Sequence, residues 1–264
     1  MADKSPESKE PTNKPAPDAK LERWGYFMKL QFHPEIRLDK KRGFEFAQQL
    51  VPFFDAQSSE LKADRWVFKQ PLGTSPDCFL SIIVSQKELQ MHGSNPMSKT
   101  EIYETKYKKL LEVFEEFFKP EMILSSSAMV NGSLRIDGDA RLFLAQHVMK
   151  IDPARNDAFG RPIHLVGIRF FFPPFRKKGA KKKEKNDIVE WQVDVKAESF
   201  IEDPTLLFLE ADADWVKPRP WDSEAVEEEI QRLGIVSGYL ETNVLAFLQH
   251  ESDPPIDTSS EESE

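Results

Sequence analysis

The chain has 264 residues, of which 39% are hydrophobic and 31% are charged, enough for one large folded unit or two small ones. Its formal net charge of -9 argues against coating nucleic acid over the whole surface, because phosphate binding needs clustered Lys and Arg. The single cysteine, Cys78, excludes an intramolecular disulfide and a cysteine-based zinc site. No apolar run resembles a membrane span or a signal peptide, so we expect a cytoplasmic protein without a membrane partner.

Both ends of the sequence lack the apolar residues that a folded core requires. Residues 1–22 and 251–264 are predicted to be disordered tails, because no burial offsets the entropy lost on ordering them. The second tail holds six acidic residues and no basic one, which gives it a charge of -6. Between the tails we expect a first half, 23–120, and a second half, 121–250, within one globular unit.

The first half begins with a strand pattern followed by a helical one. Every second residue from Trp24 to Phe32 is apolar, which predicts a strand with one buried face. A helix is expected over Asp39–Phe54, and strands over Arg65–Gln70 and Cys78–Met91. The buried stripe of that helix is predicted from its apolar spacing to hold Phe44, Ala47, Leu50 and Phe54.

The most regular helix is expected to end the first half. Ser98 and Glu101 have the spacing of a capping box, in which each side chain satisfies a backbone N–H of the first turn. Pro120 is expected to end this helix. Its apolar stripe consists of Tyr103, Tyr107, Leu110, Phe114 and Phe117.

The second half repeats the strand and helix patterns. A long strand is predicted from Met122 to Ile136, and Asp139 can cap a short helix through Met149. The last helix is expected to begin at Ser223 and to carry an apolar stripe from Val226 to Phe247, with a break possible at Gly234 or Gly238. Three strands are predicted between these helices, over Ile163–Phe172, Ile188–Phe200 and Leu206–Val216.

This order of elements predicts an α+β fold with one or more mainly antiparallel sheets, long helices packed on one face, and two topologically similar halves. In the alternative arrangement, residues 1–136 form a ferredoxin-like unit of their own. The two arrangements differ in where the strand from Met122 pairs.

The layout of four segments resembles that of a sporadically distributed bacterial protein family of unknown function. These segments are Trp24–Phe32, the Tyr- and Phe-rich helix before Pro120, the strand around Leu134–Ile136 and the final helix with Leu245–His250. The resemblance covers most of the chain and implies no reaction.

A phenylalanine-rich strand followed by a lysine-rich loop is the main candidate binding site. The three consecutive residues Phe170–Phe172 put apolar side chains on both faces of a strand, so we expect either burial on both faces or, as the alternative, an exposed binding surface. Residues 176–187 carry seven basic and two acidic residues, a net charge of +5, in a predicted hairpin loop. The candidate binding residues are Phe170, Phe172, Phe175, Arg176, Lys177, Lys178, Lys181, Lys182, Lys183 and Lys185.

Motifs for catalysis and cofactor binding are missing from the sequence. It has no nucleophile elbow, no phosphate-binding glycine loop and no histidine pair with metal-ligand spacing, so no catalytic residue, metal or cofactor is predicted. Glu210, Asp212 and Asp214 alternate along one predicted strand and, with Asp137 or Asp139, could bind Mg²⁺ for a hydrolase. Carboxylates on one face of a strand lie about 7 Å apart, which favours a solvated sheet face.

We therefore expect a non-enzymatic, cytoplasmic adaptor or interaction protein whose partner is another protein. Nucleic-acid binding through the phenylalanine-rich strand and the 176–187 loop is the first alternative, because exposed rings beside cations suit single-stranded nucleic acid. A metal-dependent hydrolase is the second alternative.

Overall fold

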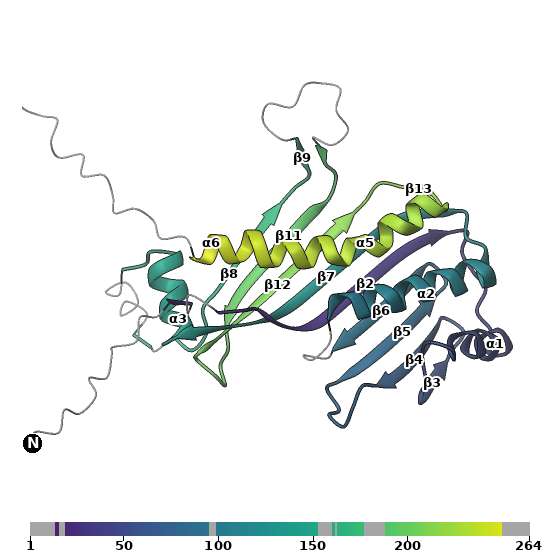
Figure 1. Ribbon diagram of the computed structural model, residues 1–264, viewed down its shortest axis with the longest axis horizontal. Coiled ribbons are helices and arrows are strands. Elements are labelled where there is room, and N and C mark those ends of the chain that lie inside the picture. Colours follow the sequence, from purple (N-terminus) through teal and green to yellow (C-terminus); the bar gives the residue numbers. More distant parts are fainter. Residues whose placement is uncertain are drawn as a thin grey trace, which may run out of the picture.

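The computed structural model describes residues 14–15, 19–94, 99–152, 160–161, 163–176 and 188–249. These residues form an α+β fold in which every strand pairing of the main sheet is antiparallel, as the sequence predicts. Within the described ranges, eleven strands belong to this sheet, and nine of them follow one another in the order β3-β4-β5-β6-β2-β7-β12-β11-β8 (Figure 1). None of the described helices is long and apolar enough to cross a membrane.

The first part of the chain forms one side of the sheet. Its elements are β2 (Glu22–His33), α1 (Lys40–Leu50), β3 (Ser58–Leu61), β4 (Arg65–Pro71), β5 (Phe79–Ser85), β6 (Glu88–Ser94) and α2 (Thr100–Phe118). Strand β1 (Lys14–Pro15) falls within the predicted N-terminal tail and pairs with the end of β7.

The rest of the chain forms the other side. Its elements are β7 (Met122–Asp137), α3 (Ala140–Leu142), the π-helical turn η1 (Phe143–Val148), β8 (Gly167–Phe172), β9 (Phe175–Arg176), β10 (Ile188–Val189), β11 (Gln192–Ser199), β12 (Leu206–Trp215), β13 (Arg219–Pro220), α5 (Ser223–Tyr239), the π-helical turn η3 (Leu240–Val244) and α6 (Leu245–Gln249).

Strand β7 joins the two sides into one sheet. It pairs with β2 along one edge and with β12 along the other, so that Ala128 lies between Met28 and Ala213. The described strands of residues 1–136 therefore form no sheet apart from the rest, which disagrees with the ferredoxin-like alternative.

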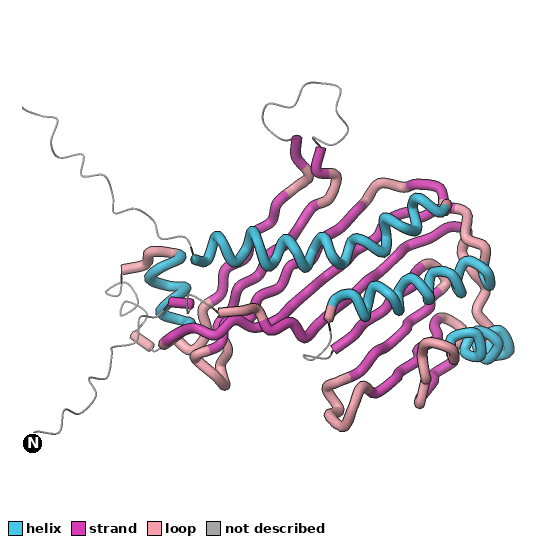
Figure 2. Tube along the Cα trace, viewed as in Figure 1, coloured by secondary structure: helices cyan, strands magenta, loops and turns pink. Residues whose placement is uncertain are grey.

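The long helices lie along one face of the sheet. Helices α2 and α5 contact each other, and both run across the near side of the sheet in Figures 1 and 2. Strand residues that point toward them, such as Leu30, Ile82 and Leu209, are completely buried. On the other face the strands carry mostly polar residues, for example Lys29 and Asp212, because successive side chains of a strand point to opposite faces.

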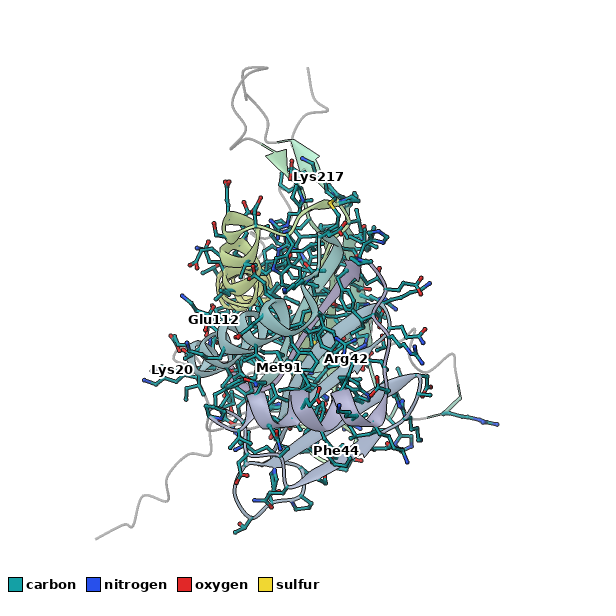
Figure 3. All side chains as sticks on the ribbon, turned by 90° about the vertical axis from the view of Figure 1, so that its right-hand side faces the viewer. Lys20, Arg42, Phe44, Met91, Glu112 and Lys217 are labelled. Carbon is teal, nitrogen blue, oxygen red and sulfur yellow. The ribbon has the colours of Figure 1, made fainter. Side chains whose placement is uncertain are left out.

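Two predictions about the first part are wrong. The segment Cys78–Met91 is not one strand but a hairpin of β5 and β6, which turns where the Ser85 hydroxyl accepts from the backbone N–H of Glu88. Helix α1 buries Phe46 and Leu50, whereas Phe44 is exposed (Figure 3). The buried side of α1 is therefore turned about the helix axis from the predicted side, because Gly43 lets the helix lie close to Trp66 of the sheet.

A β-bulge places the Trp24 side chain on the opposite face of the sheet from the one predicted. The pairing of β2 with β7 shifts between Arg23 and Gly25, and the Trp24 ring contacts Phe208 at 5.7 Å between centroids. Along β12 buried and partly exposed residues alternate, and Phe208 belongs to the partly exposed set, on the face away from the helices. The Trp24 side chain thus lies on the other face of the sheet from Tyr26, whose ring contacts Tyr103 of α2.

Helix ends agree with the sequence only in part. Asp139 caps α3 as predicted, but the cap of α5 is Asp222, which accepts from the backbone N–H of Ala225, and not Ser223. Ser98 lies outside the described residues, and Lys99 occupies the N-cap of α2. Helix α5 continues through Gly234 and Gly238 without a break.

Candidate functional site

The edge strand β8 carries the predicted phenylalanines. Phe170 and Phe172 point toward the helices, as their cross-strand partners Val195 and Val193 are buried there, while Phe171 points to the other face. Among the described residues, β8 pairs with β11 along one side only. Its other side therefore presents backbone N–H and C=O groups that pair with no strand of the described ranges.

Exposed phenylalanines surround this edge. Five phenylalanines of the described residues are exposed, and four of them belong to β8, β9 or α6: Phe171 (59%), Phe172 (44%), Phe175 (55%) and Phe247 (50%). The expectation that the phenylalanine-rich strand is buried on both faces is wrong. The physical reason is that β8 ends the sheet and has no layer over its second face in the described part of the chain.

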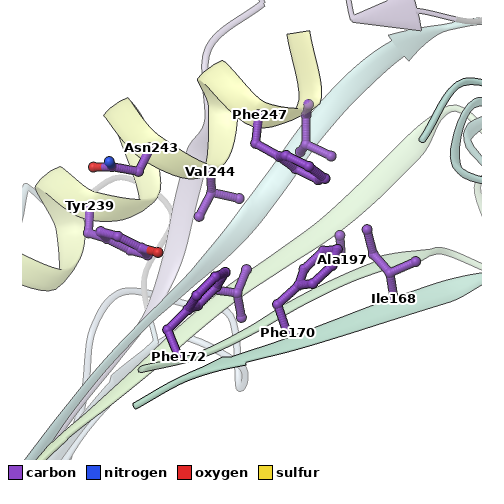
Figure 4. A pocket seen from close by; sticks show the side chains of 10 residues that line it. Ile168, Phe170, Phe172, Ala197, Tyr239, Asn243, Val244 and Phe247 are labelled. Carbon is purple, nitrogen blue, oxygen red and sulfur yellow. The ribbon is translucent and has the colours of Figure 1, made fainter. Parts of the chain in front are cut away.

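A pocket opens between β8, β11 and the C-terminal helix, which consists of α5, η3 and α6 in direct succession (Figure 4). Its volume is about 270 Å³, and its lining carries no charged side chain. The residues that line it are Ile168, Phe170, Phe172, Val195, Ala197, Tyr239, Asn243, Val244, Phe247 and Leu248. Phe170 and Phe247 form its aromatic wall, with ring centroids 5.3 Å apart and an interplanar angle of 78°.

A change in helical winding shapes the helix side of the pocket. The π-helical turn η3 follows α5 directly and contains Asn243 and Val244, both of which line the pocket. Such turns insert one extra residue into a helix and change the direction of the following side chains. The turn thereby contributes to placing Phe247 of α6 over Phe170.

Tyr239 supplies the polar group that is turned into the pocket. Figure 4 shows its hydroxyl end directed between Val244 and Phe172, while the Asn243 amide is directed away from the aromatic wall. The Tyr239 ring packs against Trp191, with centroids 5.4 Å apart and planes at 90°. Burial raises the pKa of Tyr239 above its ordinary value, so the hydroxyl remains neutral and can both donate and accept.

The structure brings together only part of the predicted site. Phe170 and Phe172 line the pocket, and Phe175 lies beyond it on β9, which pairs with β10. Arg176 ends β9, and its side chain is not described. Lys177, Lys178, Lys181, Lys182, Lys183 and Lys185 lie outside the described residues.

Sequence reasoning missed the helix side of the pocket. Val244 and Phe247 belong to the stripe that was predicted to be core, and no sequence signal marks Tyr239 or Asn243. These residues become neighbours of Phe170 only through the pairing of β8 with β11 and the packing of the C-terminal helix on the sheet.

The carboxylates proposed as metal ligands do not converge. Glu210 bonds to Lys196 at 3.0 Å, and Asp214 accepts from the Ser127 hydroxyl at 2.6 Å. Asp139, at the other end of β7, is paired with Arg141. In the described ranges, no group of three His, Cys, Asp or Glu side chains is placed to hold a metal ion. The metal-dependent hydrolase therefore lacks a site among these residues.

Asp212 is the carboxylate with the most unusual environment. It lies between Asp214 and Glu210 along β12 and opposite Asp194 of β11, and burial together with these negative charges raises its pKa to about 6. Lys29 of β2 opposes this shift only in part. The folded state thus binds a proton at Asp212 more tightly than the unfolded chain does, so this residue favours folding at low pH.

We expect Asp212→Asn to stabilise the protein at pH 8 and to leave its stability nearly unchanged at pH 4. The free energy of unfolding of the wild type should fall as the pH rises from about 4 through 6, because the folded state then loses the favoured proton. Since the side chain is only partly buried and water screens it, we expect a gain of about 1 kcal/mol. Urea unfolding at both pH values measures this gain.

Asp214→Asn is the matched control for this prediction. Asp214 accepts hydrogen bonds from Ser127 and Gln192, so its replacement should not stabilise the protein at pH 8. A loss of stability for Asp212→Asn at pH 8 would contradict the expected repulsion.

Comparisons with known proteins assign this chain to no family. No protein-family model matches the chain, and no curated protein matches it. The resemblance to a sporadically distributed bacterial family thus stays an expectation.

Proposed function

We propose that this chain is a non-enzymatic, cytoplasmic binding protein whose partner is an extended segment of another protein, added as a strand to the free edge of β8. The observation that supports this proposal is that the free edge, the exposed phenylalanines and the apolar pocket coincide. In strand addition, backbone hydrogen bonds provide affinity and pockets for alternate side chains provide specificity. The β8 edge offers both.

The pocket is large enough for one bulky side chain. Sites that enclose a drug-sized ligand have volumes of about 300–1,000 Å³, and this pocket, with about 270 Å³, lies just below that range. A strand that extends the sheet beside β8 directs every second side chain toward the helices. One such side chain would enter the pocket.

The charges beside β8 fit a partner of low net charge. On the face opposite the helices, Arg169 is paired with Asp194 and Lys196 with Glu210. These pairs cancel, and the pocket lining adds no charge. The described side chains beside this edge therefore show no excess of positive charge, which phosphate binding requires.

Single-stranded nucleic acid is the second candidate partner. It is favoured by the exposed rings of Phe171, Phe172 and Phe175, on which bases could stack, and by the Arg and Lys residues that follow in the sequence.

We also infer that the two halves repeat one plan. The orders β4-β5-β6-β2 and β8-β11-β12-β7 correspond strand for strand, with β2 and β7 antiparallel at the centre. In the first half, Phe46 of α1 lies between β4 and the long helix α2, against Phe68 and Phe114. In the second half, the space between β8 and the C-terminal helix is the pocket. This open space distinguishes the second half from the first, in which Phe46 fills the corresponding place.

Selection from a random displayed peptide library tests the proposed function. We expect the selected peptides to share apolar residues at alternate positions, and Phe172→Glu to weaken their binding by at least about tenfold, because it places a charge in the pocket. Phe44→Glu is the control, since Phe44 is also an exposed phenylalanine but lies on α1, away from β8. Urea unfolding establishes that both variants fold.

Three results would overturn the proposal. These are failure to select any peptide, equal binding of the selected peptides to the Phe172→Glu protein, and equal weakening by Phe44→Glu. Binding of a single-stranded oligonucleotide that depends on Phe172, without peptide binding, would favour the second candidate.

A further inference from the structure

We infer that the pocket beside β8 is a recognition site for a phenolic ring, such as a tyrosine side chain of the partner segment, whose hydroxyl group hydrogen-bonds to Tyr239. This inference deepens the proposed function and rests on it for the identity of the partner, but the preference of the pocket for a phenol can be measured without any peptide.

The walls of the pocket favour an aromatic occupant. Phe170 contacts Phe247 edge to face and lies 6.2 Å from Phe172 between centroids, so rings line two sides of the space. Offset and edge-to-face contacts add attraction between aromatic rings beyond the area that they bury. The occupant must also be uncharged, because the lining offers no side chain of opposite charge.

The hydroxyl of Tyr239 indicates that the occupant also has a polar end. It is directed into the pocket (Figure 4), and within the described part of the chain it has no hydrogen-bond partner. Trp191 packs against the Tyr239 ring from outside the set of lining residues, so the position of the ring is supported from behind. A polar group at the wall of an apolar pocket weakens the binding of a purely apolar occupant, which leaves it unpaired, and strengthens the binding of one that can hydrogen-bond to it.

A phenol meets each of these conditions. Its ring contacts Phe170 and Phe247, it is neutral near pH 7, and its hydroxyl can donate to or accept from Tyr239. A purely aliphatic side chain would fill the space but leave the Tyr239 hydroxyl without a partner. A phenylalanine would add the ring contacts alone.

Titration of the full chain with p-cresol and with toluene, followed by NMR, tests the inference. The two probes reproduce the side chains of tyrosine and phenylalanine and differ by one hydroxyl group. We expect p-cresol to bind about threefold to tenfold more tightly than toluene, which is the effect of one hydrogen bond, and to shift the resonances of β8 and α6. A purely apolar pocket would prefer toluene, because burying an unpaired hydroxyl is unfavourable.

Two variants test whether the preference for p-cresol over toluene depends on the Tyr239 hydroxyl. Tyr239→Phe should abolish the preference for p-cresol while toluene binding is retained, which also shows that the pocket is intact. Tyr107→Phe, the same change at a buried tyrosine of α2 that does not line the pocket, should keep the preference. The inference is overturned if toluene binds as tightly as p-cresol, if the preference persists in Tyr239→Phe, or if neither probe binds at β8. A pocket that prefers p-cresol while the library yields no peptide would overturn the proposed partner and retain the phenol site.

Discussion

Phe46→Ala is expected to lower the free energy of unfolding by about 3–5 kcal/mol, as large-to-small replacements of buried aromatic residues do. Phe46 is fully buried and contacts Trp66 and Phe68 of β4 as well as Phe114 and Phe118 of α2. Its ring thereby connects α1, the sheet and the long helix. Rigid aromatic neighbours collapse poorly into the space that the substitution leaves, which places the expected loss in the upper range.

Phe44→Ala is the matched control, because the same change is made two residues earlier in the same helix. Phe44 is 60% exposed, so we expect its replacement to change stability by no more than about 0.5 kcal/mol. Urea unfolding of both variants, compared at equal m-values, measures the difference. Similar losses for the two variants would show that the buried face of α1 is assigned wrongly.

Glu229→Gln is expected to cost about 3–5 kcal/mol, because it removes the central negative charge of a buried cluster. Glu229 and Arg232 of α5 are both buried, and Glu229 pairs with Arg232 and with Arg219 of β13. Arg232 also bonds to the Ser126 hydroxyl of β7 and lies 4.5 Å from the centroid of the Trp215 ring. Burial lowers the pKa of Arg232 to about 10, so this cation depends strongly on its partner.

Glu228→Gln provides the control for the buried cluster. Glu228 also pairs with Arg219, but its side chain is 56% exposed, so we expect a loss of less than about 1 kcal/mol. Adding Arg232→Met to Glu229→Gln should restore part of the stability, because it removes the cation left without a counter-charge. Equal losses for the two glutamate variants, measured by urea unfolding, would contradict a buried network.

The two halves of the candidate site differ in how far they could be predicted. Three consecutive phenylalanines single out Phe170 and Phe172, because a strand cannot hide all three side chains on one face. The sequence nevertheless favours burial, since it does not reveal that β8 ends the sheet. Tyr239 lies far along the chain from β8, and nothing in its local pattern relates it to the phenylalanines.

The sequence by itself determined the long helices and most of the strands, because alternating or helical spacing of apolar residues distinguishes a strand from a helix. The strand from Met122 to Asp137 and the cap at Asp139 are examples. Tertiary structure decided that Phe46, and not Phe44, enters the core, that β7 joins two halves into one sheet, and that the space beside β8 remains open. These outcomes depend on strand order and on the volumes of side chains from distant segments, which no local pattern contains.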